Sequence, residues 1–431
     1  MNNQHKIIYK PVKISSTGIL VTLFLILTAA VAAQELTTES EPASSSRLSG
    51  RLLLHRSLTT VDTHIDIPDY LATAKADPAL DGPMQVDIPK MITGGLDIGF
   101  FIVYVRQASL TSEEYSTAYQ MAITKFDAIE RMVKQNPYNI GLARSPEEAK
   151  ALVRDGKIAA VIGVENGFPL GENLEHLDEF SRRGAQYISL VHDGNNHLAD
   201  SARPKGEYPH SAEPVNNGLS ETGKAAVRRM NELGIMVDVS HASKDTTLQI
   251  AALSHAPIIA SHSSVKAVFE HARNLTDEEL RAIAETGGVV QIVAFDAYLR
   301  EIPDGQKQSA EKIRESLGLV GDSWFEKITQ EQEKEYRLKV NELDSSWPRA
   351  TVRKFVDHID YAVKLIGIEH VGIASDFGGG GGIKGWDDAS ELPNVTFELV
   401  RRGYSKADLE KIMGGNLLRV WSKVRQTSGA D

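Results

Sequence analysis

The 431-residue chain contains no cysteine, which excludes a disulfide scaffold, a disulfide-linked partner, a thiolate metal site and a cysteine nucleophile. It is also short of positive charge, because 47 Lys and Arg residues stand against 58 Asp and Glu residues, a formal net charge of -11. Such an acidic chain is a poor candidate for binding nucleic acid. No G-x-G-x-x-G or G-x-x-x-x-G-K-[ST] motif follows a predicted strand, which argues against a nucleotide cofactor.

Residues 1–33 have the layout of a secretory signal peptide. A basic start with Lys6, Lys10 and Lys13 precedes an uncharged apolar run over 18–33 that ends in small residues. The apolar run is short for a membrane span. We therefore predict that the segment is cleaved and the protein exported, either to the periplasm or as a secreted protein; the alternative is a retained N-terminal membrane anchor. Residues 34–50 are polar and rich in Ser and Glu, which predicts a flexible leader.

From residue 51 onward, short apolar runs alternate with helical patterns, which predicts one catalytic domain over 51–431. Helix start patterns separate the runs, such as the capping box that begins at Thr276. Eight runs have the near-continuous apolar character of parallel strands buried on both faces: 58–64, 96–105, 158–165, 186–192, 235–241, 257–262, 288–294 and 370–376. The alternation predicts an α/β fold, a (β/α)8 TIM-type barrel, with a doubly wound open sheet as the alternative.

A long insertion at about 295–369 separates the seventh and eighth predicted strands. It includes a charge-rich stretch at 326–342, and such stretches commonly form solvated helices. A long connection after a strand opens on the catalytic face of a barrel. A lid or a subunit contact is therefore the alternative interpretation of this insertion.

Histidines and carboxylates lie at the ends of six of the eight predicted strands. They are His64, Asp66, Glu165, His192, His241, His262 and Asp376. Barrel enzymes place their active sites at the C-terminal ends of the strands, so these side chains should meet at one rim. One such residue alone would suggest a hydrogen-bonded core position, but histidine and carboxylate are rarely buried without a partner. The convergence of all seven favours a metal centre.

The spacing of these residues suggests how two metal ions would be held. His64 and Asp66 share a face of an extended strand and can bind one ion. His241 and His262, from adjacent strands, can bind a second, and the two oxygens of Glu165 can bridge the pair. Histidine and carboxylate ligands suit Zn2+, with Mn2+, Co2+ and Fe2+ as alternatives. Two ions at the usual spacing of about 3.5–4 Å would hold a shared hydroxide, which is a nucleophile at neutral pH.

Three more residues have expected roles around that nucleophile. Asp376 would steer the water and exchange protons with it. His192 would donate hydrogen bonds to the substrate carbonyl oxygen as it becomes an oxyanion. Arg273 follows the sixth predicted strand, and it either binds a substrate carboxylate in a bidentate pair or forms a salt bridge within its loop.

The segments DTHIDIP, GVENG, VDVSHAS, ASHSSVKAV, HARN and VGIASDFGG together resemble the membrane (renal-type) dipeptidases and their bacterial relatives. The resemblance extends from about residue 61 to residue 421, and the order VDVSH, ASHSS, HARN is specific. It implies a (β/α)8 barrel of the metallo-dependent hydrolase type with two zinc ions per chain. It also implies cleavage of dipeptides that have a free C-terminal carboxylate.

On the matching positions, the resemblance implies the same assignments that the residue types favour. They are five metal ligands (His64, Asp66, Glu165, His241 and His262), an acid/base (Asp376), a contact to the scissile carbonyl (His192) and a carboxylate anchor (Arg273). The chain departs from the family pattern at Gly378, where relatives often have aspartate, and at Phe168, where many have histidine. The animal relatives use disulfides, so a homodimer of this chain is expected to be noncovalent.

The leading hypothesis from the sequence is an exported zinc dipeptidase for small peptides, including those with a D-residue at the second position. One alternative keeps the two metals but acts on another small amide or on a lactam. The other is a barrel that binds a ligand without catalysis. That alternative requires loss of the water-activating residues, and all of them are present.

Overall fold

The computed structural model describes residues 41–204, 215–320 and 328–429. The chain divides into two compact units, Met1–Gly50 and Arg51–Asp431. The predicted signal peptide and the first residues of the predicted leader lie outside the described residues. Helix α2 (Glu41–Arg56) begins within the segment predicted as a flexible leader, and the leucine and arginine residues toward its C-terminal end favour helix. No described helix combines the length and apolarity that a membrane span requires.

Within Arg51–Asp431, eight parallel strands form a barrel in the order β1-β2-β4-β5-β6-β7-β9-β10. The ring closes between β10 and β1, where Asp66 N donates to Phe377 O at 2.7 Å and Asp376 N donates to His64 O at 3.1 Å. The eight strands are β1 (Val61–Asp66), β2 (Ile98–Tyr104), β4 (Ile158–Glu165), β5 (Ala185–Ser189), β6 (Met236–Asp238), β7 (Ile259–Val265), β9 (Val289–Val293) and β10 (Val371–Ala374). The predicted (β/α)8 barrel is confirmed, and the open sheet is wrong.

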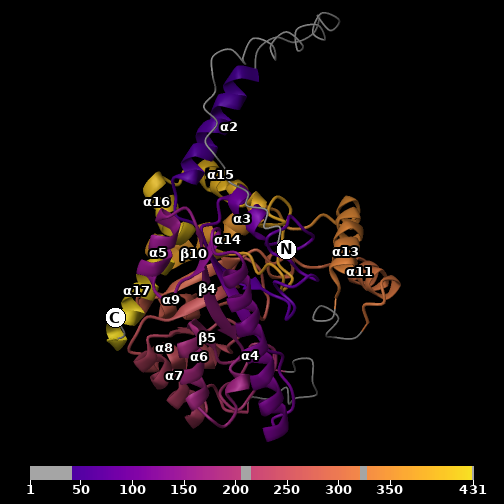
Figure 1. Cartoon of the computed structure of the whole chain (residues 1–431). Helices are drawn as coiled ribbons and strands as arrows, with labels where there is room; N and C mark the ends of the chain where they lie inside the picture. The colour runs from indigo at the N-terminus through magenta and orange to yellow at the C-terminus, as the bar shows by residue number, and fades with distance from the viewer. Residues whose placement is uncertain (1–40, 205–214, 321–327, 430–431) are drawn as a thin grey trace, which may run out of the picture. The chain divides into compact units, whose positions relative to one another are not determined.

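Helices pack against the outside of the barrel strands (Figure 1). Helix α9 begins where the sequence predicts, with a capping box formed by Thr276 and Glu279, and Ser220 caps the start of α7. The helices flanking the strands are α3 (Ile88–Gly94), α4 (Ser112–Gln135), α5 (Pro146–Arg154), α6 (Glu175–Arg183), α7 (Glu221–Leu233), α8 (Lys244–Leu253), α9 (Asp277–Glu285), α15 (Pro393–Arg401), α16 (Lys406–Glu410) and α17 (Asn416–Ser428).

The last helix, α17, closes the end of the barrel at which the strands begin. The ring of Trp421 lies 5.7 Å from the ring of Phe100, and its Nε1 donates to Gln186 Oε1 at 2.9 Å. The same apolar cluster contains Val61 and Ile98 from the starts of β1 and β2. The functional site is therefore expected at the opposite end of the barrel, where the strands end.

The ends of several strands differ from the prediction. β10 ends at Ala374, so Asp376 lies in the loop that follows rather than on the strand. β5 ends at Ser189 and β6 at Asp238, so His192 and His241 lie in the loops that follow rather than on the strands. β7 continues to Val265, so His262 lies inside it. Two short strands outside the ring, β3 (Ile140–Leu142) and β8 (Asn274–Leu275), pair with β4 and β7. They are too short to produce an alternating or apolar pattern.

The insertion between β9 and β10 contains four α-helices in the described residues. They are α10 (Asp296–Leu299), α11 (Asp304–Ser316), α13 (Gln330–Glu342) and α14 (Val352–Ile366). α14 packs against the barrel, whereas α11 and α13 pack against each other. No described residue of α13 is fully buried, as expected for the charge-rich stretch from which it forms.

Candidate metal centre

Two oxygens of one glutamate lie at the middle of the candidate centre. Glu165 ends β4, and its Oε2 lies 3.5 Å from the Nε2 of His64 on β1. The same Nε2 lies 3.3 Å from Asp66 Oδ2 and 3.8 Å from Asp376 Oδ1, which follows β10. Strands β1, β4 and β10 thus bring four of the predicted site residues to one point at the barrel rim.

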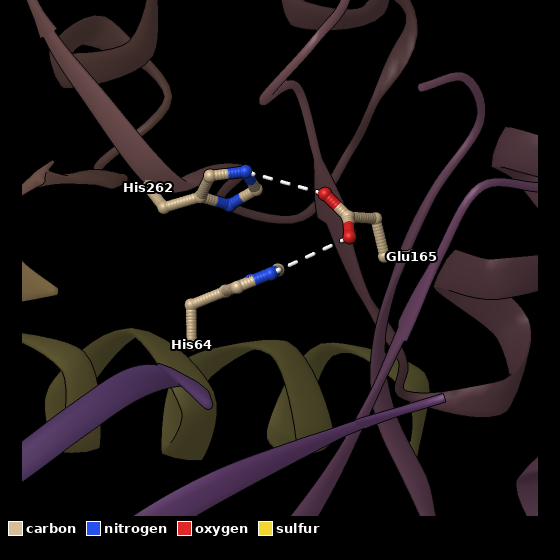
Figure 2. Close-up of side chains that lie close together, drawn as sticks. All are labelled: His64, Glu165 and His262. Carbon is tan, nitrogen blue, oxygen red and sulfur yellow. Dashed lines mark ion pairs between the residues drawn. The ribbon is translucent and has the colours of Figure 1, made fainter. Parts of the chain in front are cut away.

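The other oxygen of Glu165 faces three more imidazoles. Its Oε1 lies 3.2 Å from His241 Nε2, 3.3 Å from His262 Nε2 and 4.0 Å from His192 Nε2. Figure 2 shows His262 and His64 directed at the two different oxygens of the carboxylate. All seven predicted strand-end residues therefore meet around Glu165. Their donor atoms form three groups of possible ligands within 4.8 Å; His64 belongs to two of the groups, and Glu165 also belongs to two.

Hydrogen bonds on the far side of each ring set the tautomers of the buried histidines. The Tyr187 hydroxyl donates to Thr63 O at 3.0 Å, so it accepts from His64 Nδ1 at 2.9 Å. The Ser261 hydroxyl donates to Asp238 Oδ2 at 2.6 Å, so it accepts from His262 Nδ1 at 2.8 Å. In its neutral form, the form that can bind a metal ion, each ring therefore carries its proton on Nδ1, which leaves an Nε2 lone pair directed at the centre.

In its neutral form, the third buried histidine, His241, also carries its proton on Nδ1. Its Nδ1 lies 3.2 Å from the Asp193 carboxylate, which can only accept a hydrogen bond when ionised. His241 Nε2 and His262 Nε2 then face each other at 3.1 Å with no proton between them. His64 Nε2 is buried without a hydrogen-bond partner among the described residues. Lone pairs converging beside carboxylate oxygens fit divalent metal ions, and these histidines have the partners that metal-bound histidines usually have.

Backbone strain also concentrates at the centre. Among the described non-glycine residues, five have a positive φ, and three of these are Asn166 (75°), His241 (69°) and Asp376 (59°). A left-handed conformation costs a non-glycine residue about 1–3 kcal/mol, and such residues cluster at functional sites. The surrounding hydrogen bonds must hold these three in place.

The charges of the protein groups alone shift the pKa values of the two buried carboxyl groups, Glu165 and Asp376, in opposite directions. Burial raises the pKa of Glu165, but positive charge on His64 and His192 outweighs burial and holds that pKa well below its ordinary value. Burial lowers the pKa of His64, but Glu165 and Asp66 outweigh it and set the pKa well above its ordinary value. Burial raises the pKa of Asp376 well above its ordinary value, and Asp66 and Glu165 act in the same direction. A carboxyl with a raised pKa suits proton exchange near neutral pH.

Arg273 is only 2% exposed and lies behind Tyr298, whose ring centroid is 5.3 Å from the guanidinium carbon. The guanidinium donates to His262 O at 3.1 Å and to Ser263 Oγ at 3.4 Å. Its Nε has no hydrogen-bond partner, and it forms no ion pair with any described residue. The alternative of a salt bridge within the loop therefore finds no support in the described part of the chain.

Residues 51–430 match the family model described as membrane dipeptidase, peptidase family M19. The chain belongs to the membrane dipeptidase family. It is therefore a metallopeptidase of the dipeptidase type, as the residues at the strand ends predict. The resemblance seen in the short motifs extends over the whole of the barrel.

Individual relatives agree with this assignment. The chain is 30% identical to dipeptidase aclJ of Aspergillus oryzae over 350 residues, which are 80% of this chain and 71% of that protein. It is 35% identical to the probable dipeptidase PvdM from Pseudomonas aeruginosa. The match to the crystal structure of PvdM covers 89% of this chain and 99% of the PvdM chain, with a TM-score of 0.76. A metallopeptidase from Rhodobacter sphaeroides, liganded with a phosphinate mimic of L-Ala-D-Ala, has the same fold at 22% identity and a TM-score of 0.67, covering 85% and 99% of the two chains.

Sequence reasoning did not find the residues behind the imidazoles. Asp193, Tyr187, Ser261 and Asp238 hold the rings of the three buried histidines. Two of them could have been suspected, because Asp193 directly follows His192 and Asp238 is a carboxylate inside an apolar strand. Tyr and Ser in strands are ordinary, so the other two gave no signal. Arg203 was also missed; its Nη1 lies 2.8 Å from Asp193 Oδ2.

Proposed function

We propose that this chain is a zinc dipeptidase that hydrolyses dipeptides with a free C-terminal carboxylate, including those with a D-residue at the second position. The observation that carries the proposal is the convergence of three Nε2 lone pairs on the two oxygens of Glu165. His64 and Asp66 would hold one Zn2+, His241 and His262 the other, with Glu165 shared. Two such ions would lower the pKa of bound water and so would supply a hydroxide nucleophile at neutral pH.

The remaining residues act on the substrate and its protons. Asp376 accepts a proton from the attacking water and returns it to the leaving amine, a role that its raised pKa supports. His192 lies 22% exposed at the edge of the centre, where its side chain can donate to the carbonyl oxygen as negative charge develops. Arg273 binds the C-terminal carboxylate; its buried Nε without a partner favours an anionic ligand.

The test is hydrolysis of a dipeptide panel by protein stripped with a chelator and then given Zn2+ back. The panel includes L-Ala-L-Ala and L-Ala-D-Ala, because the Rhodobacter sphaeroides protein carries a mimic of the latter. We expect activity to vanish with the chelator and to return with Zn2+. Absence of metal-dependent cleavage of every dipeptide would refute the proposal.

The carboxylate anchor separates the dipeptidase from an amidohydrolase that acts on other small amides or lactams. Arg273→Ala should lower kcat/KM for dipeptides by about 1.5–3 kcal/mol, roughly 10- to 150-fold, because a charge-assisted bidentate contact is lost. Dipeptide amides, which lack the carboxylate, should be affected much less. Equal loss on both substrate series would favour the amidohydrolase.

We further propose that the protein is exported after cleavage of residues 1–33 and that it forms a noncovalent homodimer. The basic and apolar pattern of the N-terminal residues supports export. N-terminal sequencing of the protein recovered from outside the cytoplasm tests cleavage, and a protein that retains Met1 in the membrane fraction would favour the anchor. Light scattering of the purified protein measures the oligomeric state.

A further inference from the structure

The cavity at the barrel mouth is much larger than a small dipeptide requires. Its volume is about 1020 Å³, at the upper limit of the range of about 300–1,000 Å³ that holds drug-sized ligands. Asp66, Glu165 and Asp376 of the candidate metal centre line one part of it. The far part is lined by the insertion between β9 and β10.

Two helices of the insertion turn one face each toward this cavity. On α11 the lining residues are Gln306, Lys307, Ala310 and Arg314, whose spacings of three and four residues place them on one helix face. On α13 the lining residues are Glu333, Tyr336, Arg337, Val340 and Asn341. Leu338 lies between them in sequence but is 58% exposed and does not line the cavity. The helix pair therefore has an inner face toward the site and an outer face toward solvent.

The segment after β1 forms the facing wall. It includes Tyr70, Met84 and Val86, all of which line the cavity. The Tyr70 hydroxyl donates to Ile328 O at 2.5 Å, which ties this wall to the insertion. Together with Tyr336 and Val340, these residues form an apolar and aromatic surface in a wall that also contains the charged side chains of Arg314, Glu333 and Arg337. The apolar surface suits an apolar group of a ligand.

The strand order indicates which end of a dipeptide faces this far part. In the ring β1-β2-β4-β5-β6-β7-β9-β10, β1 lies opposite β6. Arg203 lies in the connection from β5 to β6, and Arg273 follows β7, so both cationic side chains belong to the β5–β7 side. Arg203 lines the cavity, whereas Arg273 lies behind the lining residue Tyr298. A C-terminal carboxylate held on that side leaves the N-terminal residue of the dipeptide directed toward β10 and β1. The insertion and the 70–86 segment lie beyond these strands.

We propose that the inner faces of α11 and α13, with the 70–86 segment, form a specificity compartment for a large apolar or aromatic side chain on the N-terminal residue of the dipeptide. The inference rests on the proposed dipeptidase function and deepens it by naming the substrate class. Small dipeptides are still hydrolysed, because the metal centre and the carboxylate anchor do not depend on the compartment. They leave the compartment unfilled.

The test compares kcat/KM of the zinc-loaded full-length protein for Ala-Ala, Trp-Ala and Ala-Trp. We expect Trp-Ala to exceed both other substrates, by roughly 10- to 100-fold over Ala-Ala, the range set by filling one apolar pocket. If Ala-Ala is hydrolysed but Trp-Ala is no better, or if Ala-Trp is the best substrate, the compartment assignment is wrong. If none of the three is hydrolysed, the proposed function fails and the compartment with it.

A second experiment fills the compartment with a tryptophan side chain. Ala310→Trp and Val340→Trp should each lower kcat/KM for Trp-Ala roughly 10-fold or more while changing Ala-Ala by no more than about twofold. Leu338→Trp, on the outer face of α13, is the matched control and should leave both substrates unchanged. Thermal denaturation establishes that each variant is folded. Equal loss on Ala-Ala and Trp-Ala with an unchanged melting temperature would overturn the proposal.

Discussion

Asp193 holds the ring of His241 in place, so its removal tests whether the imidazoles are set for metal binding. Asp193→Ala removes the acceptor that lies 3.2 Å from His241 Nδ1 and breaks the 2.8 Å ion pair with Arg203. A hydrogen bond to a charged group contributes about 1.5–3 kcal/mol. Changes behind metal-bound histidines usually weaken metal binding about 10- to 100-fold. We therefore expect the Kd of one of the two Zn2+ ions to rise about 10- to 100-fold.

The assay is a competition titration of metal-free protein against a zinc-chelating dye. The control is Asp178→Ala, which removes a carboxylate that also pairs with an arginine, Arg229, but on a helix surface. Exposed ion pairs contribute about 0–1 kcal/mol, so this variant should bind zinc like the parent protein. If Asp193→Ala also binds both ions with the parent affinity, the assignment of His241 as an oriented ligand is wrong.

Three further predictions concern the acid/base, the glycine-rich loop and pH. Asp376→Asn should lower kcat about 100- to 10,000-fold with unchanged zinc content, and an unchanged kcat would remove Asp376 from the mechanism. A Cβ at Gly379 would lie 2.4 Å from Asp66 Oδ2 and 2.6 Å from Asp376 Oδ1, so Gly379→Ala should abolish turnover while the protein stays folded; normal turnover would contradict this geometry. Burial lowers the pKa of His358 from 6.5 to about 4. Because the unfolded chain then binds a proton that the native chain does not, stability is complete above pH 6.5 and falls toward pH 4. In His358→Gln, the free energy of urea unfolding should depend less steeply on pH, by a slope equivalent to up to about one bound proton. An unchanged slope would refute the assignment.

The fold could be predicted because its strands are buried on both faces. Near-continuous apolar runs stand out from the amphipathic helices between them, and caps such as Thr276 mark where helices begin. The short strands β3 and β8 could not be predicted, because two or three residues carry no periodicity. The ends of β5 and β6 were also missed, since the apolar run continues past Ser189 and Asp238 into buried loops.

The histidines and carboxylates that face the candidate metal centre could be predicted for a different reason. Histidine and carboxylate at the ends of buried strands are costly unless they act together, so their positions already imply convergence. The layer behind them depends on the spacing between strands that are not neighbours in sequence. Tyr187 on β5 reaches His64 on β1 across the barrel interior, and no local pattern reveals such a pair. The burial of Arg273 behind Tyr298 is likewise a result of tertiary packing.

Anomalous diffraction from crystals of the zinc-loaded protein, measured at the zinc absorption edge, tests the central claim most directly. We predict two peaks per chain, one beside His64 and Asp66 and one beside His241 and His262, with Glu165 in contact with both. A single peak elsewhere in the chain, or none in protein soaked with excess Zn2+, would contradict the account.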